Sequence, residues 1–155
     1  TFTRQGLRVG CILLPQSHAP EASSGKNGQP ADFSQISQTM HALNQKCDLT
    51  IGLSPWGWTQ EKRFISSDVP GPDILLGSGP GPALEGEVSP EGKTLWVRPY
   101  SRGRALNVIT INNVQDRSWE KGWDLQSDIH LQFQVLDHKV PTNQEMQNLL
   151  NSLAR

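Results

Sequence analysis

The sequence has little of three things that would narrow its function at once: excess charge, cysteine and long apolar runs. Its 14 Lys and Arg residues nearly balance 15 Asp and Glu residues over 155 positions. No net charge therefore favours nucleic acid, an anionic membrane surface or a polyacidic partner. The longest apolar run, Val9 to Leu14, is far shorter than the ~20 residues that span a bilayer. We expect neither a nucleic-acid partner nor a membrane span.

The two cysteines, Cys11 and Cys47, lie in or beside apolar, strand-like runs. That setting favours inert buried thiols over a disulfide framework or a metal site. No charged segment followed by an apolar one opens the sequence, so any signal segment was removed or was never there. The length fits one domain over residues 1–155 with one core.

Periodicity predicts an α/β domain that begins with a parallel βαβ unit. Leu7–Leu14 is almost continuously apolar, as expected for a central strand covered on both faces. Residues 15–31 are rich in Pro, Gly, Ser and Asn and predict a long loop. A capping-box pattern at Asp32 and Gln35 then begins a helix, and Asp48–Leu53 has the character of a second strand. The apolar residues of that helix recur at helical spacing: Phe33, Ile36, Met40 and Leu43.

The rest of the chain predicts a short helix, further strands of a mixed sheet and a terminal helix. The short helix is expected near Gln60–Ser66. The strands are expected at Asp73–Leu76, Leu95–Arg98, Ala105–Ile111 and Ile129–Leu136. In the last of these, apolar and polar residues alternate, so one face should be buried. A capping box at Thr142 and Glu145 begins the terminal helix, whose apolar stripe is Met146, Leu149, Leu150 and Leu153.

Three segments in the middle of the chain carry a family resemblance. Cys47–Gly57 reads CDLTIGLSPWG, Val69–Gly77 reads VPGPDILLG, and Gly92–Leu106 contains GKTLW and RPYSRGRAL. In order and spacing they resemble the second half of the catalytic domain of 5'-nucleotidase-type calcineurin-like metallophosphoesterases, over Gly6 to Ile111. The resemblance implies half of a metallophosphatase-like sandwich. Because that family is often exported, it also implies an extracytoplasmic, periplasmic location.

The metal-binding histidines of that family are replaced here. The family's strands end in Leu-Ser-His-x-Gly and in Asp-x-Ile-Leu-Gly-Gly-His-x-His, whereas this sequence has Pro55, Gly79 and Gly81 at the three histidine positions. None of these side chains can bind a metal. The family's remaining ligands come from an earlier half with Asp-x-His, Gly-Asp and Gly-Asn-His motifs. The sequence has no such half before Gly6: Gly-Asp and Gly-Asn-His are absent, and the one Asp-x-His, Asp128-Ile129-His130, comes after the resembling segments. We therefore expect no resident metal, no cofactor and no catalytic residue.

Ligand-binding candidates remain at the carboxyl ends of the expected strands, where open α/β sheets bind ligands. Ser54 and Ser78 could each give a hydrogen bond there, and Trp56 or Trp58 could stack on an organic group. Since glycine at position 79 removes bulk, a vacated pocket could receive a small molecule. Two alternatives stay open: the tryptophans pack against the next helix, and the loop collapses into the space.

Arginines and histidines give weaker candidates. Arg98, Arg102 and Arg104 could clamp a carboxylate or phosphate, but a solvated hairpin face is the favoured interpretation. The four histidines lack ligand spacing and are expected to be solvated or locally hydrogen-bonded: His18, His41, His130 and His138. Trp119 and Trp123 are expected to pin their segment to the core.

Two classes of function follow. The first is a non-catalytic domain of this fold that acts as a binding or assembly module. The second is part of a metal-dependent 5'-nucleotidase or phosphoesterase whose N-terminal half is missing from this chain. In either case the sheet face that meets the other half must be covered. We expect a homodimer, or the helix Thr142–Arg155 lying over that face.

Overall fold

The computed structural model describes residues 1–4, 6–16, 33–100, 103–112, 114 and 121–153. Its larger sheet has six strands in the order β1-β2-β3-β4-β6-β5, where β2, β3, β4 and β6 are parallel to one another and the outer two strands are antiparallel to their neighbours. The strands are β1 (Phe2–Arg4), β2 (Leu7–Leu13), β3 (Leu49–Ser54), β4 (Ile74–Gly77), β5 (Leu84–Val88) and β6 (Leu95–Arg98). The carboxyl ends of four strands therefore meet at one edge.

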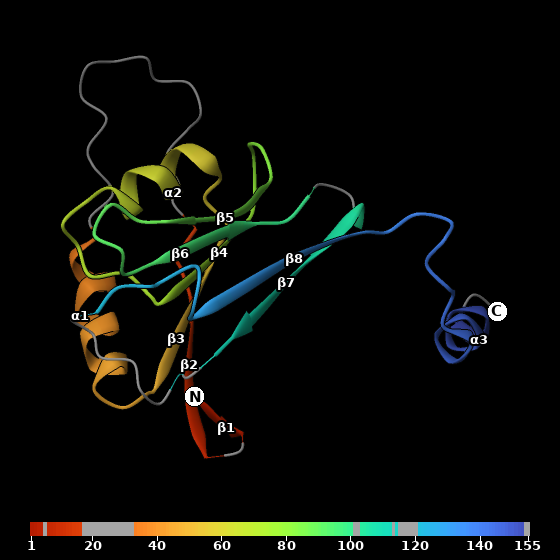
Figure 1. Ribbon diagram of the computed structural model, residues 1–155, viewed down its shortest axis with the longest axis horizontal. Helices are drawn as coiled ribbons and strands as arrows, with labels where there is room; N and C mark the ends of the chain where they lie inside the picture. The colour runs from red at the N-terminus through yellow and green to blue at the C-terminus, as the bar shows by residue number, and fades with distance from the viewer. Residues whose placement is uncertain (5, 17–32, 101–102, 113, 115–120, 154–155) are drawn as a thin grey trace.

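A two-stranded hairpin and two helices cover the opposite faces of this sheet. β7 (Ala105–Ile111) pairs antiparallel with β8 (Ile129–Val135) and crosses in front of the sheet in Figure 1. α1 (Ser34–Asn44) and α2 (Trp58–Ile65) pack on the other face. The class predicted from the sequence, α/β with a mixed sheet, a parallel βαβ start and later antiparallel strands, is confirmed.

The sheet is buried on both faces along its central strands. In β4, Ile74 faces the hairpin and Leu75 faces the helices, and both are almost fully buried. Alternate residues thus point to opposite faces of the sheet and pack into two separate cores, which explains why these strands are continuously apolar. The hairpin-side core centres on Val9, Leu49, Ile74, Leu95, Val97, Trp123 and Ile129. The helix-side core centres on Leu14, Ile36, Met40, Phe64, Ile65, Leu75 and Trp96.

A buried carboxylate fixes the register at the amino ends of the strands. Asp73 Oδ2 accepts hydrogen bonds from the Thr50 N–H and from Thr50 Oγ1, each at 2.7 Å. The Asp73 carbonyl accepts one from Trp123 Nε1 at 2.8 Å. Trp123 is buried, so its predicted role in pinning its segment to the core is confirmed. Trp119 lies outside the described residues.

The strand prediction differs from the structure in several details. β1 and β5 were not expected, because β1 is only three residues long and β5 carries two glutamates and a glycine. β2 is flanked by strands on both sides, but it is not covered on both faces as predicted, because Leu13 is 73% exposed. Its Cys11 is exposed, so the expectation of a buried thiol fails there, while Cys47 is buried as expected.

The predicted helix starts need correction too. Asp32 lies outside the described residues, and Phe33 occupies the N-cap of α1 with no side-chain hydrogen bond to the helix. At the last helix the capping residue is Asn143, not Thr142, because Asn143 Oδ1 accepts from the Met146 N–H at 2.9 Å. Of the expected loop 15–31, the structure describes only residues 15 and 16.

The terminal helix α3 (Gln144–Leu153) stands apart from the sheets in Figure 1. Its residues are all exposed, and its apolar stripe is therefore unpartnered. The expected cover of the sheet face by this helix is not the arrangement seen here. Within the described part of the chain, no helix is long and apolar enough to cross a membrane.

Candidate functional site

The loops after β3 and β4 lie side by side at the carboxyl edge of the parallel strands and are tied together by hydrogen bonds. Ser78 Oγ donates to the Ser54 carbonyl at 2.8 Å. The Gly57 N–H donates to the Ser78 carbonyl at 2.9 Å, and the Trp58 N–H donates to the Pro80 carbonyl at 2.8 Å. Many polar groups of the two loops therefore form hydrogen bonds with the opposite loop.

The two glycines of the second loop are packed against the first loop. Gly79 has φ +76°, and a Cβ built on it would lie 2.7 Å from the Pro55 carbonyl oxygen. A Cβ on Gly81, at φ +124°, would overlap the Cβ of Trp58. Histidine would be strained and crowded at either position. The loop has collapsed into the space that the sequence suggested as a vacated pocket, so Gly79 faces the neighbouring backbone and not a ligand cavity.

A buried ion pair between α2 and β6 contacts the loop after β4 and holds it in place. Glu61 of α2 and Arg98 of β6 are 0% and 2% exposed as side chains, and Arg98 Nη1 donates to Glu61 Oε2. Trp96 Nε1 also donates to Glu61 Oε2, at 2.9 Å, and the Ser78 N–H donates to Glu61 Oε1 at 3.1 Å. The carboxylate therefore joins a helix, a strand and the loop.

The other nitrogens of the same arginine reach the loop directly. Arg98 Nε donates to the Pro82 carbonyl at 2.9 Å, and Nη2 donates to the Gly79 and Pro80 carbonyls at 3.0 and 3.2 Å. The interpretation of Arg98 as part of a solvated hairpin face is wrong. Arg104 is exposed as that interpretation expects, and Arg102 lies outside the described residues.

Both tryptophans after β3 pack against protein and not into an open cavity. The Trp56 ring lies 5.8 Å from Phe33 and 5.6 Å from Phe64 between centroids, and its Nε1 donates to the Pro15 carbonyl at 2.5 Å. The Trp58 ring lies 4.6 Å from that of Trp96. The alternative held open from the sequence, packing against the next helix, is what the structure shows for Trp56, through Phe64 of α2. Trp58 is the first residue of that helix and packs on Trp96 of β6.

The open cavity at this edge lies on the other face of the sheet, between it and β7. We call it the apolar groove; its volume is about 420 Å³. It is lined by Leu13, Leu53, Ser54, Pro55, Leu76, Gly77, Ser78, Val97, Pro99, Ala105, Leu106, Asn107 and Ile109. Of the predicted site residues it therefore brings together Ser54 and Ser78, but not Trp56, Trp58 or Gly79.

The apolar groove offers contact surface and hydroxyls but no acid–base chemistry. None of its lining residues is charged or is a histidine or cysteine. Ser78 Oγ is engaged with the Ser54 carbonyl, and Ser54 Oγ accepts from the Trp56 N–H at 3.2 Å. A serine nucleophile needs an adjacent base to activate it. No lining residue supplies one, so the groove is suited to binding an apolar group.

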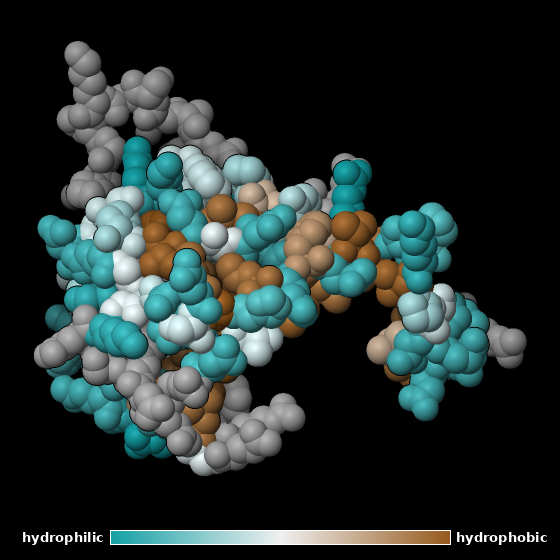
Figure 2. Space-filling view, viewed as in Figure 1, coloured by the Kyte–Doolittle hydropathy of each residue, from teal (hydrophilic) through white to brown (hydrophobic). Residues whose placement is uncertain are grey.

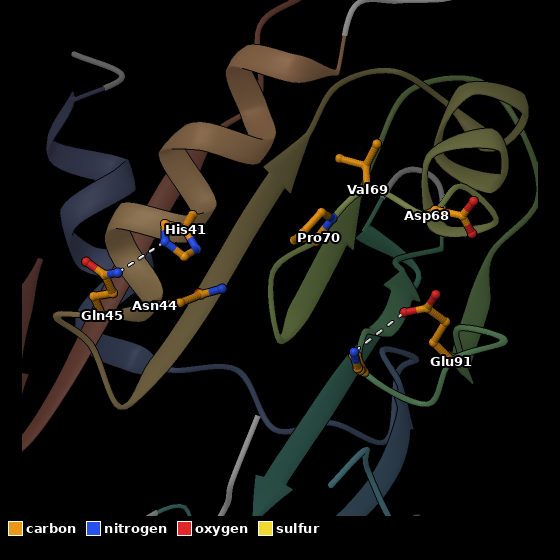
Figure 3. A pocket seen from close by; sticks show the side chains of 9 residues that line it. His41, Asn44, Gln45, Asp68, Val69, Pro70 and Glu91 are labelled. Carbon is orange, nitrogen blue, oxygen red and sulfur yellow. Dashed lines mark hydrogen bonds and ion pairs between the residues drawn. The ribbon is translucent and has the colours of Figure 1, made fainter. Parts of the chain in front are cut away.

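A second pocket, of about 550 Å³, lies near the amino ends of β4 and β6, away from the carboxyl edge. Figure 3 shows His41 and Asn44 of α1, with Gln45 just after the helix, on one side and the loops that carry Asp68 and Glu91 on the other. Gln45 Nε2 lies 3.1 Å from His41 Nε2, and Lys93 Nζ lies 3.7 Å from Glu91 Oε2. Each of these two pairs joins residues of one segment. Asn44 Oδ1, which belongs to another lining residue, is buried without a hydrogen-bond partner among the described residues.

The residues do not fit the metal centre that the family resemblance implies. Pro55, Gly79 and Gly81 offer no donor side chain, and their backbone is committed to loop packing. Among the residues that the structure describes, no three His, Cys, Asp or Glu side chains come together as a ligand set. His130 and His138 are exposed, and His18 lies outside the described residues.

Sequence reasoning missed Glu61, the residue that organises this edge. It lies in a helix of mostly polar residues, WTQEKRFI, where nothing in the pattern marks one glutamate as buried. The available signal was a tryptophan and an arginine inside the otherwise apolar strand LWVR, which require polar partners when buried.

Comparisons with known proteins add no relative to this description. The sequence matches no protein-family model and no curated protein, and the structure matches no solved structure.

Proposed function

We propose that this chain is a non-catalytic domain, related to metallophosphatases of the 5'-nucleotidase type, that acts as a binding or assembly module through its apolar groove. The observation that carries the proposal is the contrast at the carboxyl edge. The loops at the metal-ligand positions are closed on themselves by Arg98 and by the packing of Gly79. The groove beside them stays open and uncharged.

The shape and chemistry of the groove favour an apolar helical segment as its partner. Its walls are aliphatic side chains from β2, β3, β4, β6 and β7. An amphipathic helix binds such a surface by placing apolar residues at spacings of three and four into it. Two of the aliphatic side chains, Leu13 and Leu53, are 73% and 38% exposed. Their burial by a partner would be favourable at roughly 25 cal/mol per Å² of apolar surface.

The alternative function is a hydrolase completed by an N-terminal half outside this chain. Its support is the order of the motifs in the sequence. Against it, the three replaced positions belong to this chain, so a supplied half would still meet Pro55, Gly79 and Gly81. Sequence before Thr1 carrying Asp-x-His, Gly-Asp and Gly-Asn-His motifs would favour the enzyme.

The test of the non-catalytic assignment is a hydrolysis assay with a chromogenic phosphate monoester and with nucleotides, in the presence of zinc or manganese. We expect no turnover above a mock preparation. Turnover that is proportional to protein and lost on chelation would overturn the proposal.

A further inference from the structure

We propose that the apolar groove receives the chain's own terminal helix, α3. The proposal rests on the proposed function, since it names the segment that the binding surface takes. The structure shows the helix detached (Figure 1). The proposal therefore has two arrangements of α3, this open one and a docked one. When docked, it competes with any other helical partner for the groove.

The two surfaces are matched in polarity, and each lacks a partner. The stripe of α3 is exposed along its length: Met146 55%, Leu149 52%, Leu150 53% and Leu153 76%. Figure 2 shows apolar atoms of α3 on the side turned toward the rest of the molecule. At the groove, Leu13 is 73% and Leu106 52% exposed. Exposed apolar patches of this kind mark interaction sites.

Charge does not oppose the contact. Only one residue of α3, Glu145, is charged, and it lies at the start of the helix, where a negative charge is favourable. The groove carries no charged lining residue. Docking would therefore desolvate apolar surface without burying an unpaired charge.

The connection is long enough and starts in the right place. Val135, the last residue of β8, pairs with Ala105, which itself lines the groove. Residues 136–143 then lead to Gln144, and a segment of this length reaches at most about 26–29 Å. The groove extends from β6 to β2, three strand spacings or about 14 Å. The helix can therefore reach the groove of its own chain.

The same tether favours docking within one chain over exchange between two chains. A short flexible connection gives an effective concentration on the order of millimolar. At the micromolar concentrations of a solution assay, the helix of a second molecule competes poorly with that.

Cys11 provides a native reporter of the docked state. It is exposed and lies two residues before Leu13 on β2, so both side chains point to the same face of the sheet. The other cysteine, Cys47, is 6% exposed. A helix over Leu13 and Leu53 would shield the Cys11 thiol from a modifying reagent.

The test compares the rate of maleimide modification of Cys11 in the original chain and in a variant with Leu149→Glu and Leu153→Glu. We expect modification to become several-fold faster in this stripe variant. Its matched control, Asn148→Glu with Asn151→Glu, adds the same charge on the opposite side of the helix and should leave the rate unchanged. Equal rates in the original chain and the stripe variant would overturn the proposal.

Anilinonaphthalene sulfonate, a fluorescent anion whose aromatic rings bind apolar surface, separates failure of this proposal from failure of the proposed function. We expect the stripe variant to bind more probe than the original chain, and Leu13→Glu in that variant to remove the gain. Equal probe binding by both chains, abolished in each by Leu13→Glu, would overturn docking of α3 but retain the groove as a binding surface. Probe binding insensitive to Leu13→Glu in both would remove the groove and the proposed function with it.

Light scattering decides between one chain and two. We expect a monomer, with unchanged mass in the stripe variant. A dimer that dissociates in the stripe variant would show that α3 is exchanged between two copies, and it would overturn docking within one chain.

Discussion

The carboxyl edge of the parallel strands is tightly joined on one face of the sheet and open on the other. On the helix side, Glu61 and Arg98 join α2, β6 and the loop after β4 through buried hydrogen bonds. On the hairpin side of the same edge, Leu13 lines the uncharged groove and is 73% exposed. The contrast shows that the loops after β3 and β4 are held by contacts within the protein, while the exposed apolar surface lies on the other face of the sheet.

The largest expected effect comes from breaking the buried ion pair. Arg98→Met leaves the Glu61 carboxylate without its cation and leaves the Pro82 and Gly79 carbonyls without their donor. Removing one partner of a buried pair costs about 3–5 kcal/mol. We expect the free energy of unfolding in denaturant, followed by tryptophan fluorescence, to fall by that amount.

The matched control is Arg104→Met, because Arg104 is exposed and precedes β7. It should change the free energy of unfolding by less than about 0.5 kcal/mol. Equal effects of the two substitutions would contradict a structural role for the Glu61–Arg98 pair.

A smaller effect is expected at the packed loop. Gly79 and Gly6 have similar backbone angles, φ +76° and +82°, but only Gly79 would crowd a Cβ; at Gly6 nothing lies within 4 Å. Both Ala substitutions pay for the left-handed conformation, about 1–2 kcal/mol. Gly79→Ala should cost about 1–3 kcal/mol more because the loop must shift, as thermal or denaturant unfolding would show. A loop that is loosely held would give the same loss for both.

Thr50→Val probes the opposite end of the strands. There the buried Asp73 N–H loses the Thr50 hydroxyl as its acceptor, and the Asp73 carboxylate loses the same hydroxyl as a donor while it keeps the Thr50 N–H. Loss of a hydrogen bond at a buried polar group costs about 1–3 kcal/mol. Thr110→Val on the exposed face of β7 is the control and should be near neutral. If Thr50→Val were also neutral in denaturant unfolding, buried polar hydrogen bonds would stabilise the sheet only at the end that carries Glu61.

Much of the strand arrangement could be predicted from sequence, since strands of continuous apolar character require cover on both faces of the sheet. The observed bounds of Leu95–Arg98 and Ala105–Ile111 equal those expected. The burial of Arg98 could not be predicted, because its partner Glu61 lies 37 residues away in a helix whose pattern is polar. The exposure of Leu13 could not be predicted either, since an apolar strand gives no sign that part of one face lacks a cover.

A surface ion pair should give only a small, pH-dependent effect. Side-chain and backbone hydrogen bonds from Arg8 hold the pKa of Asp48 below its usual value of 3.8. Because the folded-state pKa is depressed, the stabilisation is complete above the unfolded-state pKa and is lost as pH falls through the folded-state value. Asp48→Asn should therefore lower Tm slightly near neutral pH and not in strong acid. A Tm difference that persists unchanged into strong acid would contradict this.

The smallest expected effect is on the open face. Because Leu13 is mostly exposed, Leu13→Glu should change the free energy of unfolding of the undocked chain by less than about 0.5 kcal/mol. This is measured in the background of Leu149→Glu with Leu153→Glu, which keeps α3 away. A loss of several kcal/mol would show that Leu13 is part of the core.

Amide hydrogen exchange tests most directly whether the loops after β3 and β4 are held closed by their own hydrogen bonds. The N–H groups of Gly57, Trp58 and Ser78 donate to the opposing loop or to Glu61. We expect them to exchange only through unfolding of the surrounding core, with protection close to that of β4 amides. Exchange as fast as that of exposed amides without a hydrogen bond would mean that these loops open freely, and it would contradict the account.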